Sequence, residues 1–369
     1  METSSGRRLP MAPHGAVSVS RNRRGAIAWL FASLVLPLAV TACRQEEKVL
    51  PPPPMFAITD KFFDVKPLGN KSFLLLGYQS KLWRTDDAGG TFRKLNPATK
   101  VSLTRMSFVD GGKGWGVGHV GNVFKTEDGG QSWAKEESGT EASLFDVDFP
   151  TDQKGWAVGD VSTVISTGDG GQTWKSEKIP MSQIGVREDM SLAISDPIFY
   201  SVDFLDEKTG WVGGEFGQIR FTEDGGATWG AQHQSLLTSM YRDIMSLPTI
   251  LCLRMRDRQN GVAVGTYGMI ITTQDGGQTW NFFKSPVLEP LYDIKYLADG
   301  DALIVGASGI VLRGNAESGW KAAELPPGVF TWISAVAFDP SGVGVAVGGH
   351  GLVLTSGDMG KTWEWKTNG

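Results

Sequence analysis

The chain has 369 residues, including 48 Gly and 13 Trp, and a formal net charge of −5. Because helical periodicity is nearly absent, this composition predicts one large all-β domain behind an N-terminal leader. The acidic balance lacks the basic footprint of a nucleic-acid-binding protein, so no nucleic acid is expected among the partners.

The leader, residues 1–42, has the pattern of a lipoprotein signal peptide. Arg21, Arg23 and Arg24 precede an uncharged apolar run at residues 26–40, and a lipobox follows at residues 40–43. The run is shorter than the roughly 20 residues that a spanning helix needs, so export is favoured over a membrane anchor. We therefore expect Cys43 to be lipidated. Met11 is an alternative start, because few signal peptides carry so long a segment before the apolar run.

Residues 43–55 form the expected tether, which ends in four prolines, Pro51 to Pro54. Such a segment is an extended spacer that holds a domain away from a bilayer. Arg44, rather than Asp, follows the cysteine, which by analogy with enterobacterial sorting favours the outer membrane. Acylation of Cys43 would leave Cys252 as the last thiol. It lies in a predicted strand at residues 250–255, where an inert buried cysteine is expected.

An eight-residue phrase recurs through residues 56–369: Ser or Thr, any, Asp, any, Gly, any, Ser or Thr, aromatic. Copies start at residues 85, 126, 167, 222, 273 and 356, and a seventh at residues 314–320 has lost the Asp. A period near 40 residues, with short apolar runs and glycine turns, is typical of a propeller with one blade per repeat. The predicted fold is therefore an all-β, seven-bladed β-propeller of four-stranded antiparallel blades.

The phrase is the Asp-box, and we predict a structural role for it. Each copy follows one short apolar run and precedes another, so it forms the turn of a hairpin. The carboxylate accepts backbone N–H groups inside the turn, and the aromatic residue packs back onto the domain. The six aspartates are Asp87, Asp128, Asp169, Asp224, Asp275 and Asp358.

A second phrase, Gly-Trp-x-x-Gly or a variant of it, precedes most boxes, as at residues 114–118, 155–159 and 210–214. With seven blades and a lipoprotein signal, this order resembles the photosystem II stability and assembly factor family and its relatives in non-phototrophic bacteria. The resemblance covers roughly residues 56–369. It implies a non-catalytic, lipid-anchored and monomeric binding scaffold that needs no cofactor and assists assembly or stabilisation of a membrane protein complex.

Two settings are compatible with this resemblance. In a phototroph the complex would be photosystem II or an assembly intermediate of it, and in a cyanobacterium the location would be the thylakoid lumen. In a non-phototroph, the alternative is an envelope propeller accessory to a transporter or an assembly machine at the periplasmic face of a membrane.

The loops of such a propeller define two faces. The Asp-boxes share one face with the loops between first and second strands. The opposite face is built from the turns between second and third strands and from the links between blades. His119, Asp160 and Glu215 stand at the heads of three such turns, and two insertions, residues 181–198 and 234–248, fall on the same face. We predict partner binding there; ordinary solvated turns are the alternative.

The innermost strands are expected to line the channel with mixed charges that neutralise one another. The positions facing the channel are Lys66, Ser107, Asp148, Asp203, Arg254, Lys295 and Ala337. A set of arginines is the predicted docking element for an acidic partner, with a solvated salt-bridge cluster as the alternative. The set is Arg187, Arg242, Arg254, Arg256 and Arg258, and it is expected to divide between the channel mouth and the Asp-box face.

Glycoside hydrolysis is the enzymatic alternative, because Asp-boxes also occur in sialidases. Asp160 and Glu215 on adjacent blades could supply the carboxylate pair that this chemistry needs. However, the Arg-Ile-Pro segment of sialidases is missing, and His14, His119, His233 and His350 lack the spacing of metal ligands. No catalytic or metal-binding residue is therefore expected.

Overall fold

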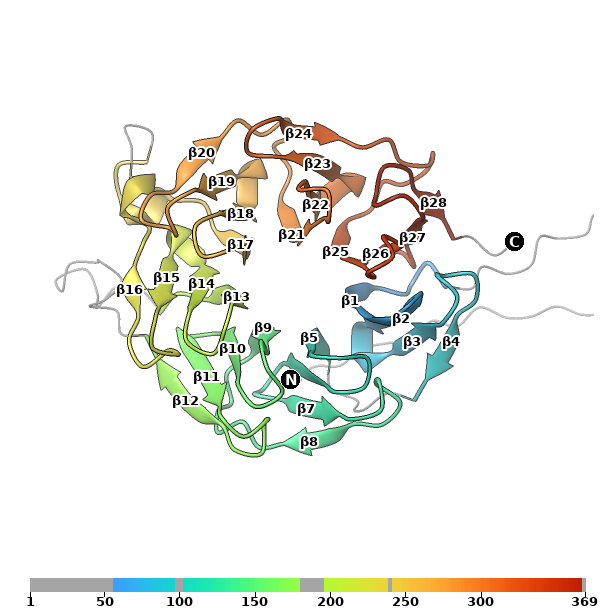
Figure 1. The fold of residues 1–369 in the computed structure, drawn as a ribbon, viewed down its shortest axis with the longest axis horizontal. Coiled ribbons are helices and arrows are strands. Elements are labelled where there is room, and N and C mark those ends of the chain that lie inside the picture. The colour runs from blue at the N-terminus through green and yellow to red at the C-terminus, as the bar shows by residue number, and fades with distance from the viewer. Residues whose placement is uncertain (1–55, 97–101, 180–195, 238–240, 367–369) are drawn as a thin grey trace, which may run out of the picture. The chain divides into compact units, whose positions relative to one another are not determined.

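The structure, a computed structural model, describes residues 56–96, 102–179, 196–237 and 241–366. Within these residues, seven four-stranded antiparallel sheets stand as blades around a central channel (Figure 1). The predicted all-β, seven-bladed propeller is therefore confirmed. The helices in the described part of the chain are short 3-10 turns, and none has the length and hydropathy to cross a membrane.

Each blade uses four consecutive strands, so the chain completes one blade before it starts the next. The first four blades are blade 1, β1 (Phe62–Gly69), β2 (Ser72–Gly77), β3 (Leu82–Thr85) and β4 (Arg93–Leu95); blade 2, β5 (Leu103–Phe108), β6 (Gly114–Gly118), β7 (Val123–Thr126) and β8 (Ala134–Glu136); blade 3, β9 (Leu144–Asp148), β10 (Gly155–Gly159), β11 (Thr163–Thr167) and β12 (Lys175–Lys178); and blade 4, β13 (Phe199–Phe204), β14 (Gly210–Gly214), β15 (Ile219–Thr222) and β16 (Gly230–Ala231).

The remaining three blades continue the same order. They are blade 5, β17 (Ile250–Met255), β18 (Gly261–Gly265), β19 (Ile270–Thr273) and β20 (Asn281–Phe283); blade 6, β21 (Leu291–Tyr296), β22 (Ala302–Gly306), β23 (Val311–Asn315) and β24 (Gly319–Ala322); and blade 7, β25 (Ile333–Phe338), β26 (Gly344–Gly348), β27 (Val353–Ser356) and β28 (Glu364–Trp365).

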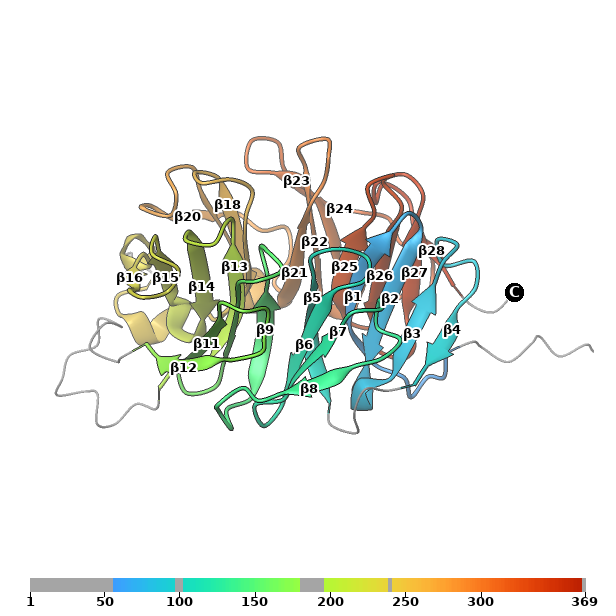
Figure 2. The same cartoon turned by 60° about the horizontal axis from the view of Figure 1, so that its bottom comes forward.

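The strands run between two faces of the ring (Figure 2). The Asp-box face holds the loops between first and second strands and between third and fourth strands. The turn face holds the turns between second and third strands and the links between blades. Short 3-10 turns lie on the turn face: η1 (Tyr78–Ser80), η3 (Glu215–Gly217), η4 (Gln234–Leu236), η5 (Ile244–Ser246), η6 (Thr266–Gly268) and η7 (Ala307–Gly309).

The box of blade 4 shows how an Asp-box closes its turn. Asp224 accepts hydrogen bonds from the backbone N–H of Thr228 at 2.9 Å and from its hydroxyl at 2.7 Å. Thr222 donates its hydroxyl to Asp224 and accepts the N–H of Gly226. The N–H and the hydroxyl of Thr228 lower the pKa of the Asp224 carboxyl. In the seventh copy, which lacks the Asp, the side-chain oxygen of Asn315 accepts the N–H groups of Glu317 and Ser318 instead.

The Gly-Trp phrase serves the packing between blades. The ring of Trp115 in blade 2 stacks on Phe149 of blade 3, with centroids 3.6 Å apart and planes at 2°. A Cβ on Gly155 would lie 2.4 Å from the Phe149 ring, so only glycine leaves room for it. Trp115 also donates its indole N–H to the carbonyl of Gly170 in the next Asp-box at 3.1 Å. The two recurring phrases therefore join adjacent blades.

The ring closes by side-chain packing, without a shared strand. Blade 7 packs directly against blade 1, whose Phe62 and Phe73 are buried with Val345 and Val347. The Ser334 hydroxyl donates to the carbonyl of Phe62 at 2.8 Å across the same junction. The first and last blades are therefore held by side-chain packing and hydrogen bonds between them.

Replacing Asp224 by Ala should lower the free energy of unfolding by about 1 kcal/mol, because the turn loses a charged acceptor. The effect is moderate because Asp224 is exposed and water can replace it. Denaturant unfolding measures the change, with Glu223→Ala in the same turn as the control. An unchanged midpoint for the Asp224 variant would contradict the structural role of the box.

Candidate functional site

Carboxylates in the channel join the innermost strands of neighbouring blades. The first strand of a blade is an edge strand, so its N–H groups need acceptors from outside the sheet. Side chains of the preceding blade supply them. Five of the acceptors are carboxylates and two are serine hydroxyls: Met106 to Asp64 at 2.8 Å, Phe149 to Ser107 at 3.1 Å, Val202 to Asp146 at 3.0 Å, Phe204 to Asp148 at 2.7 Å, Leu253 to Ser201 at 2.9 Å, Met255 to Asp203 at 2.7 Å and Val336 to Asp293 at 3.1 Å.

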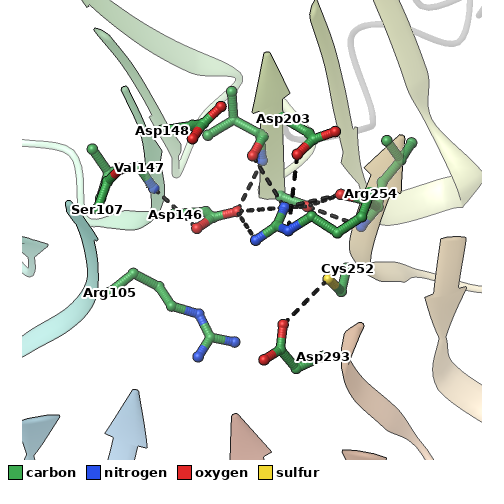
Figure 3. A network of polar contacts seen from close by, with 12 residues as sticks. Arg105, Ser107, Asp146, Val147, Asp148, Asp203, Cys252, Arg254 and Asp293 are labelled. Carbon is green, nitrogen blue, oxygen red and sulfur yellow. Dashed lines mark hydrogen bonds and ion pairs between the residues drawn. The ribbon is translucent and has the colours of Figure 1, made fainter. Parts of the chain in front are cut away.

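Arg254 compensates the charge of the acids on one side of the channel (Figure 3). Its Nη1 and Nη2 atoms lie 3.3 and 3.2 Å from one carboxylate oxygen of Asp146. Nη1 also donates to the Ser201 hydroxyl at 3.0 Å and to the Val202 carbonyl at 3.1 Å. Its side chain is 23% exposed. Arg254 is therefore engaged inside the channel.

The opposite side of the channel is organised by Arg105 (Figure 3). Its Nη1 donates to the carbonyl of Phe63 at 2.7 Å, and Asp64 lies 3.8 Å away. Nearby, the thiol of Cys252 donates to Asp293 at 3.7 Å. Burial raises the pKa of the Cys252 thiol to about 12, which disfavours the reactive thiolate. The burial expected for this cysteine is therefore confirmed.

Two of the channel acids hold their protons unusually strongly. Burial raises the pKa of Asp203 to about 7, even though Arg254 opposes the change, and the nearby Asp148 adds to it. Burial likewise raises the pKa of Asp148 to about 6. These groups therefore titrate at mildly acidic to neutral pH.

A bowl lies at the channel mouth on the turn face. In every blade, the pairing of first and second strands shifts by one residue near the start of the first strand. Such bulges re-aim side chains, and here one residue per blade lines the mouth. The seven are Phe63, Thr104, Phe145, Tyr200, Leu251, Tyr292 and Ser334; with Arg105, His119 and Trp332 they enclose about 460 Å³.

The walls of the bowl are largely aromatic. Phe63 stacks on Trp332 with ring centroids 6.4 Å apart and planes at 12°. Phe145 contacts Tyr200 at 5.3 Å, and His119 meets Phe145 edge-on at 6.5 Å. Mostly apolar cavities with a few polar groups are the usual form of binding sites. The bowl is therefore the candidate functional site.

The surface around the bowl is also apolar. Ten large hydrophobic residues are exposed among the described residues. One of them, Phe282, lies on the outer strand β20. The other nine lie on the turn face: Ile58, Tyr78, Val120, Val161, Leu237, Met245, Tyr267, Leu288 and Phe330. Apolar exposure gathered on one face is typical of an interaction surface.

Strained turns present part of this surface. Val120 and Val161 both have φ of 55°, a conformation that β-branched residues rarely adopt. Tyr267 occupies the equivalent position with φ of 57°. Glycine or asparagine would fit these turns with less strain. The fold therefore keeps bulky apolar side chains on this face at a cost in backbone strain.

The predicted arginines do not form one patch. Arg254 lies in the channel, whereas Arg256 and Arg258 lie in the loop between β17 and β18 on the Asp-box face. Arg256 donates to the Gly300 carbonyl at 3.3 Å, and Arg258 pairs with Asp206 at 2.8 Å. Arg242 is exposed on the turn face, and Arg187 lies outside the described residues. The predicted division between the channel and the Asp-box face is therefore present for Arg254 on one side and Arg256 and Arg258 on the other.

Two predicted carboxylates lie near the rim of the bowl. Glu215 accepts the N–H of Ile198 at 2.9 Å, and Asp160 heads the neighbouring turn. Burial raises the pKa of the Tyr200 hydroxyl, with Glu215 and Asp160 adding to the effect. Of the turn-head residues, His119 lines the bowl itself. The lipidation residue, Cys43, lies outside the described residues.

The two insertions differ in what the structure describes of them. Residues 180–195 lie outside the described residues, so most of the first insertion is not placed. The second insertion folds onto the domain, because Leu236 and Leu247 are buried in the core between blades 4 and 5. Asp243 caps η5 by accepting the N–H of Ser246. The second insertion is therefore partly a structural cover.

Sequence reasoning missed the aromatic residues of the bowl. Strict alternation along each first strand places Phe63, Phe145, Tyr200 and Tyr292 away from the channel, and the bulge reverses this. The signal that could have found them is the aromatic residue in the second position of four first strands. Within the described residues, no group of His, Cys, Asp and Glu has the geometry to hold a metal ion.

Part of the chain matches known sequences. Residues 131–229 match the family model described as "Photosynthesis system II assembly factor YCF48". The "Photosystem II assembly lipoprotein Ycf48" of Synechococcus sp. strain RCC307 is 33% identical over 30% of this chain and 35% of that protein. Its counterpart in Parasynechococcus marenigrum strain WH8102 is 28% identical over 45% of this chain and 48% of that protein. The chain thus spans less than half the length of these curated relatives.

The fold has a close counterpart among solved structures. A structure described as "YCF48 bound to D1 peptide" superposes with a TM-score of 0.62 and 18% identity, over 82% of this chain and 95% of that one. At this identity the match establishes the shared fold. With the sequence matches, it confirms the resemblance to photosystem II assembly factor-like propellers.

The contribution of Asp203 to the stability of the propeller should fall as the pH rises from about 4 to about 7, against an opposite contribution from His233, whose pKa burial lowers to about 4. Asp203 titrates at about 7 in the folded chain and near 3.8 in an unfolded one. Between these values the folded chain holds a proton that the unfolded chain has lost, so the contribution of Asp203 to the free energy of unfolding falls as pH rises. Asp203→Asn should remove this contribution to the slope.

Urea unfolding at half-unit pH steps measures the slope. Asp206→Asn is the control, because backbone N–H groups and Arg258 lower the pKa of Asp206 to about 2 despite its partial burial, which confines its effect to more acidic pH. A pH slope that Asp203→Asn leaves unchanged would contradict the assignment.

Proposed function

We propose that this protein is a non-catalytic, lipid-anchored scaffold that assists assembly of a membrane protein complex. It docks a polypeptide segment of a membrane subunit on the turn face, with the bowl at the centre of the contact. The observation that carries the proposal is the concentration of exposed apolar side chains around an aromatic cavity on one face. Such surfaces are suited to protein partners.

The likeness to known proteins supports the kind of partner. A propeller of the same fold has been solved as "YCF48 bound to D1 peptide". In a phototroph, the segment docked here would accordingly be a peptide of D1, and the complex photosystem II. The bowl is suited to such a ligand because it can take one or a few side chains of an extended segment.

A scaffold role also accounts for the polar groups near the site. Glu215 is occupied by the N–H of Ile198, and the channel acids bind main-chain groups of the next blade. These carboxylates therefore have structural partners. The docking contact is made by apolar and aromatic side chains, which suit binding rather than hydrolysis.

The lipid anchor fits this geometry. The chain enters the described domain at the turn face, where Gly351, in the turn between β26 and β27, donates its N–H to the backbone carbonyl of Asp60 at 2.8 Å. An extended segment of residues 43–55 would span up to about 45 Å. A lipid on Cys43 would thus keep the turn face within reach of subunits in the same membrane, on its periplasmic or lumenal side.

Photo-cross-linking from the turn face should capture an integral membrane subunit. Tyr267 is 77% exposed on the turn face, and Phe282 is 39% exposed on β20. p-Benzoylphenylalanine at position 267 should give a cross-link that mass spectrometry assigns to a membrane subunit, and the same residue at position 282 should not. Cross-links from position 282 alone, or only to soluble proteins, would refute the proposed docking face.

Replacing Cys43 by Ala should move the protein from the membrane to the soluble fraction, because the acylation site is lost. Fractionation of cells followed by immunoblotting measures the distribution, with Cys252→Ala as the matched cysteine control. If the Cys43 variant and the wild type partition alike, the lipid anchor is wrong.

A further inference from the structure

The aromatic walls of the bowl come from five of the seven blades. Phe63, Phe145, Tyr200, Tyr292 and Trp332 all line it and are half-buried. Ring faces carry partial negative charge, so a cluster of them attracts a cation that enters between them. Apolar walls alone would accept any hydrophobic group. The charges around the bowl therefore decide whether it favours a cationic group over a neutral one.

Acidic groups outnumber basic ones around the bowl. Three bowl aromatics are each followed directly by an acid of the channel, namely Asp64, Asp146 and Asp293. Two further acids, Glu215 and Asp160, lie close enough to Tyr200 at the rim to add to the rise in the pKa of its hydroxyl. Against these five acids stand three basic groups, Arg105, Arg254 and Lys66, whose Nζ lies 3.4 Å from Asp64. These eight groups therefore carry a formal charge of −2 if all five acids are ionised.

Both arginines are already compensated. Arg254 bonds to Asp146, and Arg105 lies 3.8 Å from Asp64 and donates to the Phe63 carbonyl. Their donors point at acceptors of the protein, so they offer little to an anionic guest. A cationic guest would find ring faces in the cavity, whose described lining holds no carboxylate, and two acids near its rim, Asp160 and Glu215.

We propose that the bowl binds the cationic side chain of a lysine or arginine on the docked segment, by cation–π contact with Tyr200, Tyr292 and Trp332. The inference rests on the proposed function for the source of that side chain. It reverses the charge of the guest that the predicted arginine set would attract, because Arg254 is engaged in the channel and Arg256 and Arg258 lie on the Asp-box face. The ammonium group sits among the rings, with Asp160 and Glu215 facing it from the rim.

The test uses two small probes that differ only in charge. Nα-acetyl-lysine methylamide carries the cation, and Nα-acetyl-norleucine methylamide is its neutral match. Isothermal titration calorimetry with the purified propeller should show the lysine probe binding at least five-fold more tightly. Raising the salt concentration should narrow the difference, since part of the attraction is screened.

Matched variants place the binding in the bowl. Tyr292→Ala should weaken the lysine probe about five-fold or more, within the range of cation–π contacts, whereas Tyr267→Ala removes a tyrosine from the same face outside the bowl and should leave it unchanged. Glu215→Gln should weaken the same probe, whereas Glu324→Gln makes the same charge change away from the bowl and should not. Thermal unfolding of each variant verifies that it is folded.

Equal binding of the two probes would overturn the inference and identify a purely apolar pocket. Failure of both probes to bind would overturn it as well, and so would equal effects of the Tyr292 and Tyr267 variants. None of these results tests the proposed docking face, which cross-linking from position 267 tests independently. Loss of that cross-link with lysine binding intact would instead refute the proposed function.

Discussion

The propeller depends on how each blade holds the next, because no sheet among the described residues continues from one blade to another. Along the channel, N–H groups of an edge strand find their acceptors on the preceding blade, as when Phe204 donates to Asp148. Farther out, Trp115 stacks on Phe149 over a glycine that leaves space for the ring. The closure of the ring between blades 7 and 1 uses the same principle, since it relies on packing and single hydrogen bonds.

This way of joining blades determines what the charged residues of the channel can do. The acids that accept main-chain N–H groups are not available as ligands, and Arg254 is occupied by Asp146 and Ser201. Burial in a shared cluster also keeps Asp203 and Asp148 partly protonated near neutral pH. The interior of the channel is therefore mainly structural, and the chemistry that remains for a ligand lies at its mouth.

The mouth and the Asp-box face differ in character. Loops on the Asp-box face satisfy themselves through carboxylate turns and pairs such as Arg258 with Asp206. The turn face instead exposes apolar residues, two of them valines in a left-handed backbone conformation. Strain and apolar exposure both disfavour the isolated protein, so a surface that combines them is best explained by binding. Similarity to YCF48 establishes the type of fold, and the side chains of this face carry the functional proposal.

The sequence by itself determined the number of blades and the hairpin turns, because each depends on contacts within about 40 residues that repeat along the chain. Asp224 and Thr228, four residues apart, are an example. The bowl could not be predicted in this way, since a bulge of one residue reverses the direction in which Tyr200 and Tyr292 point. The partners of Arg254 were also beyond reach, because Asp146 lies 108 residues away in sequence. Only the closed ring brings such residues together, and it decides which charges are used inside the fold and which face a partner.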